Sequence, residues 1–362
     1  MFSGEQPAVK PVALTHGVNP GTIAWSRPRA GLSAGFPGLS RRTRKEEKTM
    51  SRNGKSILLA LDGSKQALEM VRYAARCLPR ENEMVLFHVM SKVPEPLRDL
   101  GFDPGWHGED KGLAEWEKQQ EETIEEFMET GRRALLSAGF ASSAVKIKVS
   151  ELKEGFARDI AAEAVNGYEA VVLGRRGLNP LQNAVLGSIA SKLAVKLCKI
   201  PVWLVGGRPA RGKVLIAVDR SDSAMQAVDH VGKVLGGTGT AIELVHVVRG
   251  LDGTLAGYQK VFMGEYMQRL TREAEERIRP TFEEAIDHLE AFGISAGRVT
   301  TKVINGVKSR AGAILEEAET GDFGTIVAGR RGLTRTENYD MGRVIAKLLQ
   351  MARRQAVWIV GC

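Results

Sequence analysis

A glycine-containing motif that occurs twice constrains this chain more than any other feature of its sequence. In each copy two glycines flank an arginine pair, and a third glycine follows after nine further residues. The two copies are Gly174-Arg175-Arg176-Gly177 with Gly187-Ser188, and Gly329-Arg330-Arg331-Gly332 with Gly342-Arg343. They lie 155 residues apart, a repeat length that duplicates a whole domain rather than a solenoid unit. We therefore expect two similar domains.

The glycines of this motif also carry a chemical meaning. Glycine lets successive backbone N–H groups approach an anion closely, so a turn of this kind is typical of a phosphate site. The copies differ at one position, where the first has Ser188 and the second has Arg343. This difference indicates that the two copies have different roles.

The composition is that of a globular protein. With 362 residues, 43% hydrophobic and 26% charged, the chain has room for two or three domains, each with its own core. No membrane span is expected, because no apolar run reaches about 18 residues. The three cysteines, Cys77, Cys198 and Cys362, give neither a disulfide framework nor a metal-binding pair. They favour a reducing compartment and therefore a cytoplasmic protein.

The net charge of +8 comes mostly from residues 1–49, which hold eight Lys or Arg and three Asp or Glu. This segment is rich in proline and glycine and has no helical or alternating pattern, so we expect a disordered basic tail. The run from Arg41 to Lys45 is more typical of a solvated charge run than of a nucleic-acid or membrane contact. Met50 directly precedes the first predicted strand and is an alternative translation start.

Both halves of the chain alternate between apolar strands and amphipathic helices. In the first half, strands are predicted at 57–61, 84–89, 145–149, 170–173 and 202–205, with helices between them. After a linker at 207–212 the same order restarts. Continuous apolar strands imply a parallel sheet that is covered on both faces. We expect an α/β protein with two tandem doubly wound domains, 54–206 and 212–361, each a five-stranded parallel sheet with helices on both faces.

Several polar or glycine residues of the first half fall at the carboxyl ends of strands, where such sheets bind ligands. Asp62 ends the first strand, His88 and Val89 end the second, and Gly174 ends the fourth. A carboxylate there can accept hydrogen bonds from ribose, and a helix beginning at Gly187 can bind phosphate. Each feature also has a structural explanation: an Asx turn for the aspartate, tight turns for the glycines and packing for the histidine. Their occurrence at one edge favours a nucleotide site.

The sequence shows no recognisable catalytic machinery. It lacks a Walker phosphate loop, an HExxH zinc motif, a GxSxG serine motif and a Cys/His cluster. The six histidines are dispersed, and none stands out as a base beside the phosphates. A dedicated enzyme is therefore not expected, while slow hydrolysis of a bound nucleotide is left open. Mg²⁺ would accompany a triphosphate, but the sequence reveals no protein ligands for it.

The spacing G-x2-G-x9-G-[S/T], with Asp62 after the first strand and His88-Val89 at the end of the second, resembles the universal stress protein family. The resemblance covers both halves, and the first half has the G-x2-G-x9-G-S form that UspA-type members use to bind ATP. It implies two Rossmann-like domains similar to adenine nucleotide alpha hydrolases, with the strand order 3-2-1-4-5. It also implies that the last strands, near 201–205 and 356–360, pair edge to edge in an intramolecular pseudo-dimer.

The resemblance implies that ATP is bound mainly by the first half. Ala60, Asp62 and Val89 would surround adenine and ribose. The phosphates would be surrounded by Leu173, Gly174, Gly177, Gly187, Ser188 and Ile189. Arg175 and Arg176 would add positive charge there or face solvent.

The second half departs from the family pattern. Arg343 stands where the family has Ser or Thr, and the preceding loop carries Glu337 and Asp340, whose carboxylates oppose anion binding. We therefore expect this copy to be degenerate, structural or regulatory. If this copy binds nucleotide, its contacts would be Asp219, Val247, Gly329, Gly332, Gly342 and Arg343. The guanidinium of Arg343 would then bind phosphate, and otherwise it only fills the space.

Taken together, the resemblance implies a cytoplasmic, ATP-binding regulatory module of the stress response that acts on an unidentified protein partner. A homodimer of the whole chain is left open, and nucleic acid is not an expected partner. The alternatives are a stress-related interaction protein that binds no nucleotide and a slow ATP hydrolase.

Overall fold

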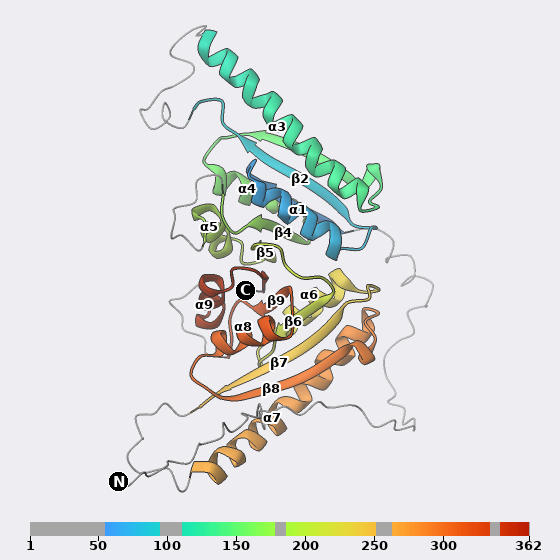
Figure 1. Cartoon of the computed structure of the whole chain (residues 1–362), viewed down its shortest axis with the longest axis vertical. Helices are drawn as coiled ribbons and strands as arrows, with labels where there is room; N and C mark the ends of the chain where they lie inside the picture. Colours follow the sequence, from blue (N-terminus) through green and yellow to red (C-terminus); the bar gives the residue numbers. More distant parts are fainter. Residues whose placement is uncertain (1–54, 95–110, 178–185, 251–262, 334–340, 362) are drawn as a thin grey trace, which may run out of the picture.

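The computed structural model describes residues 55–94, 111–177, 186–250, 263–333 and 341–361. These residues form one continuous ten-stranded sheet with helices on both faces, and each half of the chain occupies one end of it (Figure 1). The strand order is β3-β2-β1-β4-β5-β10-β9-β6-β7-β8. Each half therefore has the order 3-2-1-4-5, and the predicted α/β fold is confirmed. The two predicted sheets are joined into one.

The two halves contain matching elements. The strands of the first half are β1 (Ser56–Leu61), β2 (Glu83–Met90), β3 (Val145–Glu151), β4 (Ala170–Gly174) and β5 (Val202–Val205). Its helices are α1 (Lys65–Cys77), α3 (Lys111–Ser137), α4 (Phe156–Ala164) and α5 (Ser188–Lys196). The strands of the second half are β6 (Lys213–Ala217), β7 (Ala241–Arg249), β8 (Val299–Val307), β9 (Thr325–Gly329) and β10 (Ala356–Val360). Its helices are α6 (Asp222–Leu235), α7 (Met263–Ala291), α8 (Arg310–Thr320) and α9 (Arg343–Met351).

The helices lie in two layers because the central strands are apolar on both faces. Side chains from α1, α3, α6 and α7 pack in one core, and those from α4, α5, α8 and α9 pack in another across the sheet. The long helices α3 and α7 lie at opposite ends of the molecule (Figure 1). Serines set the start of the first helix in each half: the Oγ of Ser64 accepts from Ala67 N at 3.1 Å, and that of Ser221 accepts from Ala224 N at 3.2 Å.

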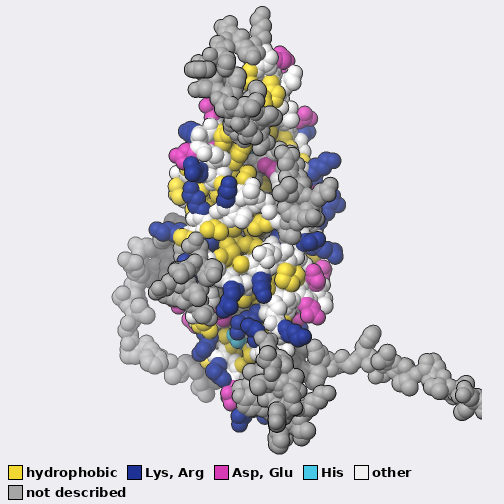
Figure 2. All heavy atoms as spheres, turned by 90° about the vertical axis from the view of Figure 1, so that its left-hand side faces the viewer, with side chains coloured by type: hydrophobic (Ala, Val, Ile, Leu, Met, Phe, Trp, Pro, Cys, Tyr) yellow, Lys and Arg dark blue, Asp and Glu magenta, His cyan; other side chains and the backbone are white. Residues whose placement is uncertain are grey.

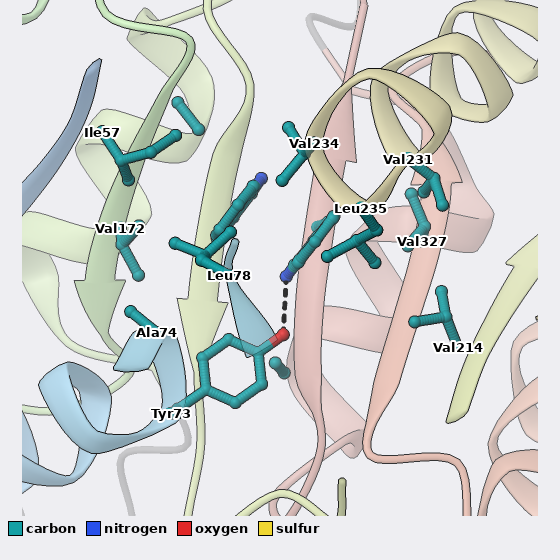
Figure 3. Close-up of a cluster of buried hydrophobic side chains, with 14 of the residues drawn as sticks. Ile57, Tyr73, Ala74, Leu78, Val172, Val214, Val231, Val234, Leu235 and Val327 are labelled. Atoms are coloured by element: carbon teal, nitrogen blue, oxygen red, sulfur yellow. Dashed lines mark hydrogen bonds between the residues drawn. The ribbon is translucent and has the colours of Figure 1, made fainter. Parts of the chain in front are cut away.

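The two halves meet where β5 and β10 pair antiparallel, as the resemblance implied. Trp203 and Trp358 face each other in this register, and their rings stack with centroids 3.8 Å apart and planes 3° apart. Each indole N–H crosses to the first helix of the other half: Trp358 donates to Tyr73 Oη and Trp203 donates to His230 Nε2, both at 3.0 Å. Figure 3 shows the Tyr73 bond among apolar side chains of both halves.

This junction is buried, and its burial fixes the protonation state of its histidine. Burial, with the nearby charges of Lys233 and Lys55, lowers the pKa of His230 to about 3, so the ring is neutral and can accept the indole hydrogen bond. Across the described ranges, no helix combines the length and apolar character needed to cross a bilayer. The predicted tail, 1–49, lies outside those ranges.

Candidate functional site

The structure brings the predicted site residues of the first half to one edge of the sheet. The first glycine turn, residues 174–177, follows β4, and Asp62 follows β1 at the same edge. The backbone fixes the turn on both sides, because Arg175 N donates to Val205 O at 3.1 Å and Gly187 N donates to Arg175 O at 2.6 Å. Gly187 is the N-cap of α5, so the turn and the helix start form one unit.

The two later glycines of the motif are needed because a side chain would not fit there. Unusual backbone angles do not explain them. A Cβ at Gly177 would lie 2.8 Å from Asp62 Oδ2, and one at Gly187 would lie 3.3 Å from Arg175 O. Gly187 has φ −68° and ψ 154°, which any residue can adopt. The glycines therefore let the aspartate, the turn and the helix start approach one another closely.

The start of α5 offers hydrogen-bond donors to an anion. No side chain caps this helix, and its first backbone bond runs from Ser191 N to Gly187 O at 2.9 Å. The N–H groups of Ser188, Ile189 and Ala190 therefore precede the first intrahelical bond. Ser188 is exposed and adds a hydroxyl at the positive end of the helix dipole.

Asp62 has two roles at this edge. Its Oδ1 accepts from Ser64 N at 3.0 Å, which is the Asx turn that was the structural alternative. Its Oδ2 lies at Gly177, on the side of the glycine turn. The carboxylate is partly exposed, so one oxygen shapes the loop while the other faces the candidate site.

His88 supports the end of β1. Its ring is 8% exposed, and its Nδ1 lies 2.8 Å from Leu61 O, the residue before Asp62. Because a carbonyl oxygen only accepts, Nδ1 carries the proton. Burial lowers the pKa of His88 and so favours the neutral ring. Its hydrogen bond to Leu61 O stabilises the backbone just before Asp62. The structure therefore matches the packing explanation for this histidine.

Four predicted contact residues supply the apolar part of the site. Ala60, Val89 and Leu173 are buried near the ends of β1, β2 and β4, and Ile189 packs against the same core from α5. The carboxyl ends of these strands therefore combine an apolar floor with the polar glycine turn and the helix start. An edge with this mixture suits a ligand with a flat apolar part and an anionic part.

The second half repeats this geometry. A Cβ at Gly332 would lie 2.7 Å from Asp219 Oδ2, and one at Gly342 would lie 3.1 Å from Arg330 O. Gly342 N donates to Arg330 O at 2.8 Å, and Gly342 caps α9 as Gly187 caps α5. The second glycine turn, residues 329–332, therefore has the same relation to its aspartate and its helix.

Two arginines distinguish the second half from the first. Arg310 begins α8, where the first half has Phe156 at the start of α4, and its Nε donates to the carbonyl oxygen of Val247 at 3.3 Å. Arg343 is exposed at the start of α9, in the position of Ser188. A guanidinium therefore contacts Val247, a predicted base or ribose contact, and a second one stands beside the expected phosphate position. Glu337 and Asp340 lie outside the described residues.

Sequence reasoning missed Arg310 and was wrong about Arg175. Aligning the two repeats would have shown an arginine opposite Phe156. Arg175 was expected to face phosphates or solvent, but its side chain is 3% exposed and donates to Leu349 O in the other half. Burial, with the charges of Arg176 and Arg353, lowers its pKa to about 10, so it stays charged at neutral pH. The neighbouring Arg176 is exposed, as one of the two expectations allowed.

A separate open cavity of about 820 Å³ lies between the halves and includes Val360 and Gly361, which contact the second glycine turn through Arg330. Acidic and basic residues both line it, and several pair with one another. His288 Nδ1 lies 2.6 Å from Asp229 Oδ1, and Lys233 forms an ion pair with Glu169. This cavity lacks the convergent donors that the glycine turns provide. In the part of the chain that is described, no three His, Cys, Asp or Glu side chains group as metal ligands.

Comparisons with known proteins agree with this architecture. The universal stress protein family profile matches residues 54–206 and 210–360. A universal stress protein from Archaeoglobus fulgidus DSM 4304 superimposes with a TM-score of 0.54 and 19% identity, covering 86% of this chain and 99% of that one. A candidate universal stress protein from Pseudomonas aeruginosa UCBPP-PA14 gives a TM-score of 0.52 and 16% identity, covering 86% and 94%. A search of curated protein sequences gives no match.

Proposed function

The chain belongs to the universal stress protein family, and from this premise we propose that its first half binds ATP and that the protein acts as a regulatory module of the stress response. One observation carries the proposal. The carboxylate of Asp62, the glycine turn and the uncapped start of α5 converge so closely that a Cβ at Gly177 would lie 2.8 Å from Asp62 Oδ2. This arrangement offers an acceptor for sugar hydroxyls beside donors for phosphate.

Each part of the site has a role in this proposal. Asp62 Oδ2 accepts hydrogen bonds from the ribose, and the buried ends of β1, β2 and β4 form the floor under the adenine. The phosphates lie at the first glycine turn and at the N–H groups and hydroxyl of Ser188. Mg²⁺ would accompany the triphosphate and offset its charge, and we assign no side chain to it.

We propose a binding module rather than an enzyme. Among the described residues, the histidine at this edge of the first half is His88, and its burial makes it unsuited to activate water at the phosphates. Asp62 accepts from Ser64 N through one oxygen and faces the proposed ribose position with the other. Binding with little or no turnover is the behaviour that this arrangement supports.

The proposal assigns ATP to the first half alone. In the second half, Arg310 donates to the Val247 carbonyl, whose counterpart Val89 belongs to the proposed base and ribose region. Asp219 is engaged at both oxygens: its Oδ2 accepts from Leu333 N at 3.3 Å, and its Oδ1 accepts from the hydroxyl of Ser221. The second site therefore retains the turn but has its base and sugar acceptors engaged.

Isothermal titration calorimetry of the full chain with ATP and Mg²⁺ tests this function. We expect saturable binding of one nucleotide per chain, because Arg310 engages the Val247 carbonyl in the second site, where the first half has Phe156. Two nucleotides per chain would contradict the assignment to the first half. An absence of heat and of saturation at millimolar ATP would contradict nucleotide binding altogether.

Exchanging the residues that distinguish the two sites should change the stoichiometry. We expect Arg310→Phe with Arg343→Ser to raise ATP binding from one to two per chain, because the Val247 carbonyl is released and the serine is restored. The reciprocal Phe156→Arg is expected to weaken binding by the first half on the order of ten-fold. Equilibrium dialysis with labelled ATP measures both, and a double variant that still binds one nucleotide would show that other residues close the second site.

A further inference from the structure

The first arginine of each glycine turn belongs to both halves of the molecule. The backbone of Arg330 forms the second turn: its N–H donates to Val360 O at 2.7 Å, and its carbonyl accepts from Gly342 N at 2.8 Å. Its side chain extends to the end of α5 in the first half. There the guanidinium donates to Ala194 O, and to Leu197 O at 2.7 Å. One residue thus shapes the turn of one site and holds the helix that opens the other site.

Arg175 repeats this arrangement in the opposite direction. Its backbone carbonyl accepts from Gly187 N at 2.6 Å in the first turn, while its side chain donates to Leu349 O near the end of α9. Leu349 occupies in α9 the place that Ala194 occupies in α5. The contacts are therefore reciprocal across the β5–β10 junction, as Figure 1 shows by the neighbouring positions of α5 and α9.

These contacts are buried, so the helix carbonyls that accept them have no access to water as a substitute donor. Arg330 is 1% exposed, and it reaches helix carbonyls that have no partner within their own helix. A guanidinium at a helix C-terminus also complements the negative end of the helix dipole. Without it, the carbonyls of Ala194 and Leu197 would lose a charged donor, and the end of α5 would be free to shift.

The short length of α5 connects its two ends. The helix has nine residues, Ser188–Lys196, and so spans on the order of 14 Å. Its C-terminal end is held by Arg330, and its N-terminal end supplies the donors of the first site. A helix of this length moves as a unit, so a shift of its last turn also displaces its first N–H groups.

We propose that Arg330 and Arg175 are positioning residues that couple the two phosphate turns, each by holding the helix that opens the other half's site. The proposal rests on ATP binding by the first half. The second half then sets the affinity of the first through Arg330, and nucleotide in the first half is sensed at α9 through Arg175.

Substitutions at Arg330 test the coupling at a distance from the nucleotide. In calorimetry on the full chain, we expect Arg330→Leu to raise the Kd for ATP on the order of ten-fold, although the residue lies in the other half. Arg330→Lys, which keeps the charge but not the planar fork, should recover part of the affinity. The neighbouring Arg331→Ala is the matched control, because that side chain is exposed, and should leave the Kd unchanged.

Hydrogen exchange on the unmodified chain gives a second test that does not depend on how a variant folds. We expect ATP to slow amide exchange in the last turn of α9, around Leu349, as well as in α5. Protection confined to the first half would overturn the coupling, as would a folded Arg330→Leu variant whose Kd stays within two-fold of the unmodified value. If the unmodified chain binds no ATP, the proposed function itself fails, a result distinct from normal binding without coupling.

Discussion

Replacing Gly187 with aspartate is expected to abolish ATP binding. The new carboxylate would lie at the start of α5, where the donors for phosphate converge, and its Cβ would lie 3.3 Å from Arg175 O. Like charges at about 4 Å repel by several kcal/mol near a protein surface, so we expect the Kd to rise about 100-fold or more. Calorimetric titration with ATP measures this change.

Two matched variants separate charge from size and from folding. Gly342→Asp places the same side chain at the equivalent N-cap of α9. It should leave the stoichiometry unchanged and alter the affinity much less than Gly187→Asp, because it reaches the first site only through Arg330. Gly187→Ala introduces the Cβ without the charge and should weaken binding much less. Aspartate is favourable at an N-cap, so both aspartate variants are expected to fold. Equal losses in Gly187→Asp and Gly342→Asp would show that ATP does not bind at the first turn.

Truncating Trp358 is expected to lower the free energy of unfolding by about 3–5 kcal/mol. The side chain is fully buried, stacks on Trp203 at 3.8 Å between ring centroids, and donates to Tyr73 Oη at 3.0 Å. Trp358→Ala therefore removes a large apolar contact between the halves together with a buried hydrogen bond. Chemical denaturation, followed by circular dichroism, measures the loss.

A conservative variant at the same position distinguishes the stacked ring from the hydrogen bond. Trp358→Phe keeps an aromatic ring against Trp203 but removes the N–H, so we expect a smaller loss, of about 1–2 kcal/mol. Trp203→Ala should resemble Trp358→Ala, because its indole makes the equivalent bond to His230. A loss below about 1 kcal/mol in both alanine variants would show that the junction contributes little to stability.

Much of the fold could be predicted because its signals are local. Apolar strands such as 57–61, serine N-caps such as Ser64 and the repeated motif together determine the element order and the duplicated α/β fold. The sequence also predicts that Asp62 and Gly174 lie at one edge of the sheet, because parallel strands place their carboxyl ends together. The close approach of Asp62 to Gly177, which makes this edge a candidate site, joins residues far apart in the sequence and is seen only in the structure.

The hydrogen-bond partners of the Arg175 and Arg330 side chains could not be predicted from local sequence signals. An arginine in a glycine turn at a sheet edge is expected in solvent, because burying a charge is costly without partners. For Arg175 and Arg330 the partners are helix carbonyls of the other half, 174 and 136 residues away in sequence. These partners are identifiable only once β5 and β10 are paired. Arg310 differs, since comparing the repeats places it opposite Phe156 without any structure.

The antiparallel pairing of β5 with β10 has a consequence for how such a protein assembles. Each strand would otherwise present an unpaired apolar edge, with Trp203 or Trp358 uncovered, and such edges recruit other chains. Because both edges belong to one polypeptide, their encounter is governed by an effective local concentration and is independent of protein abundance. A chain of this design keeps its two lobes associated at any expression level, whereas separate lobes would come apart on dilution.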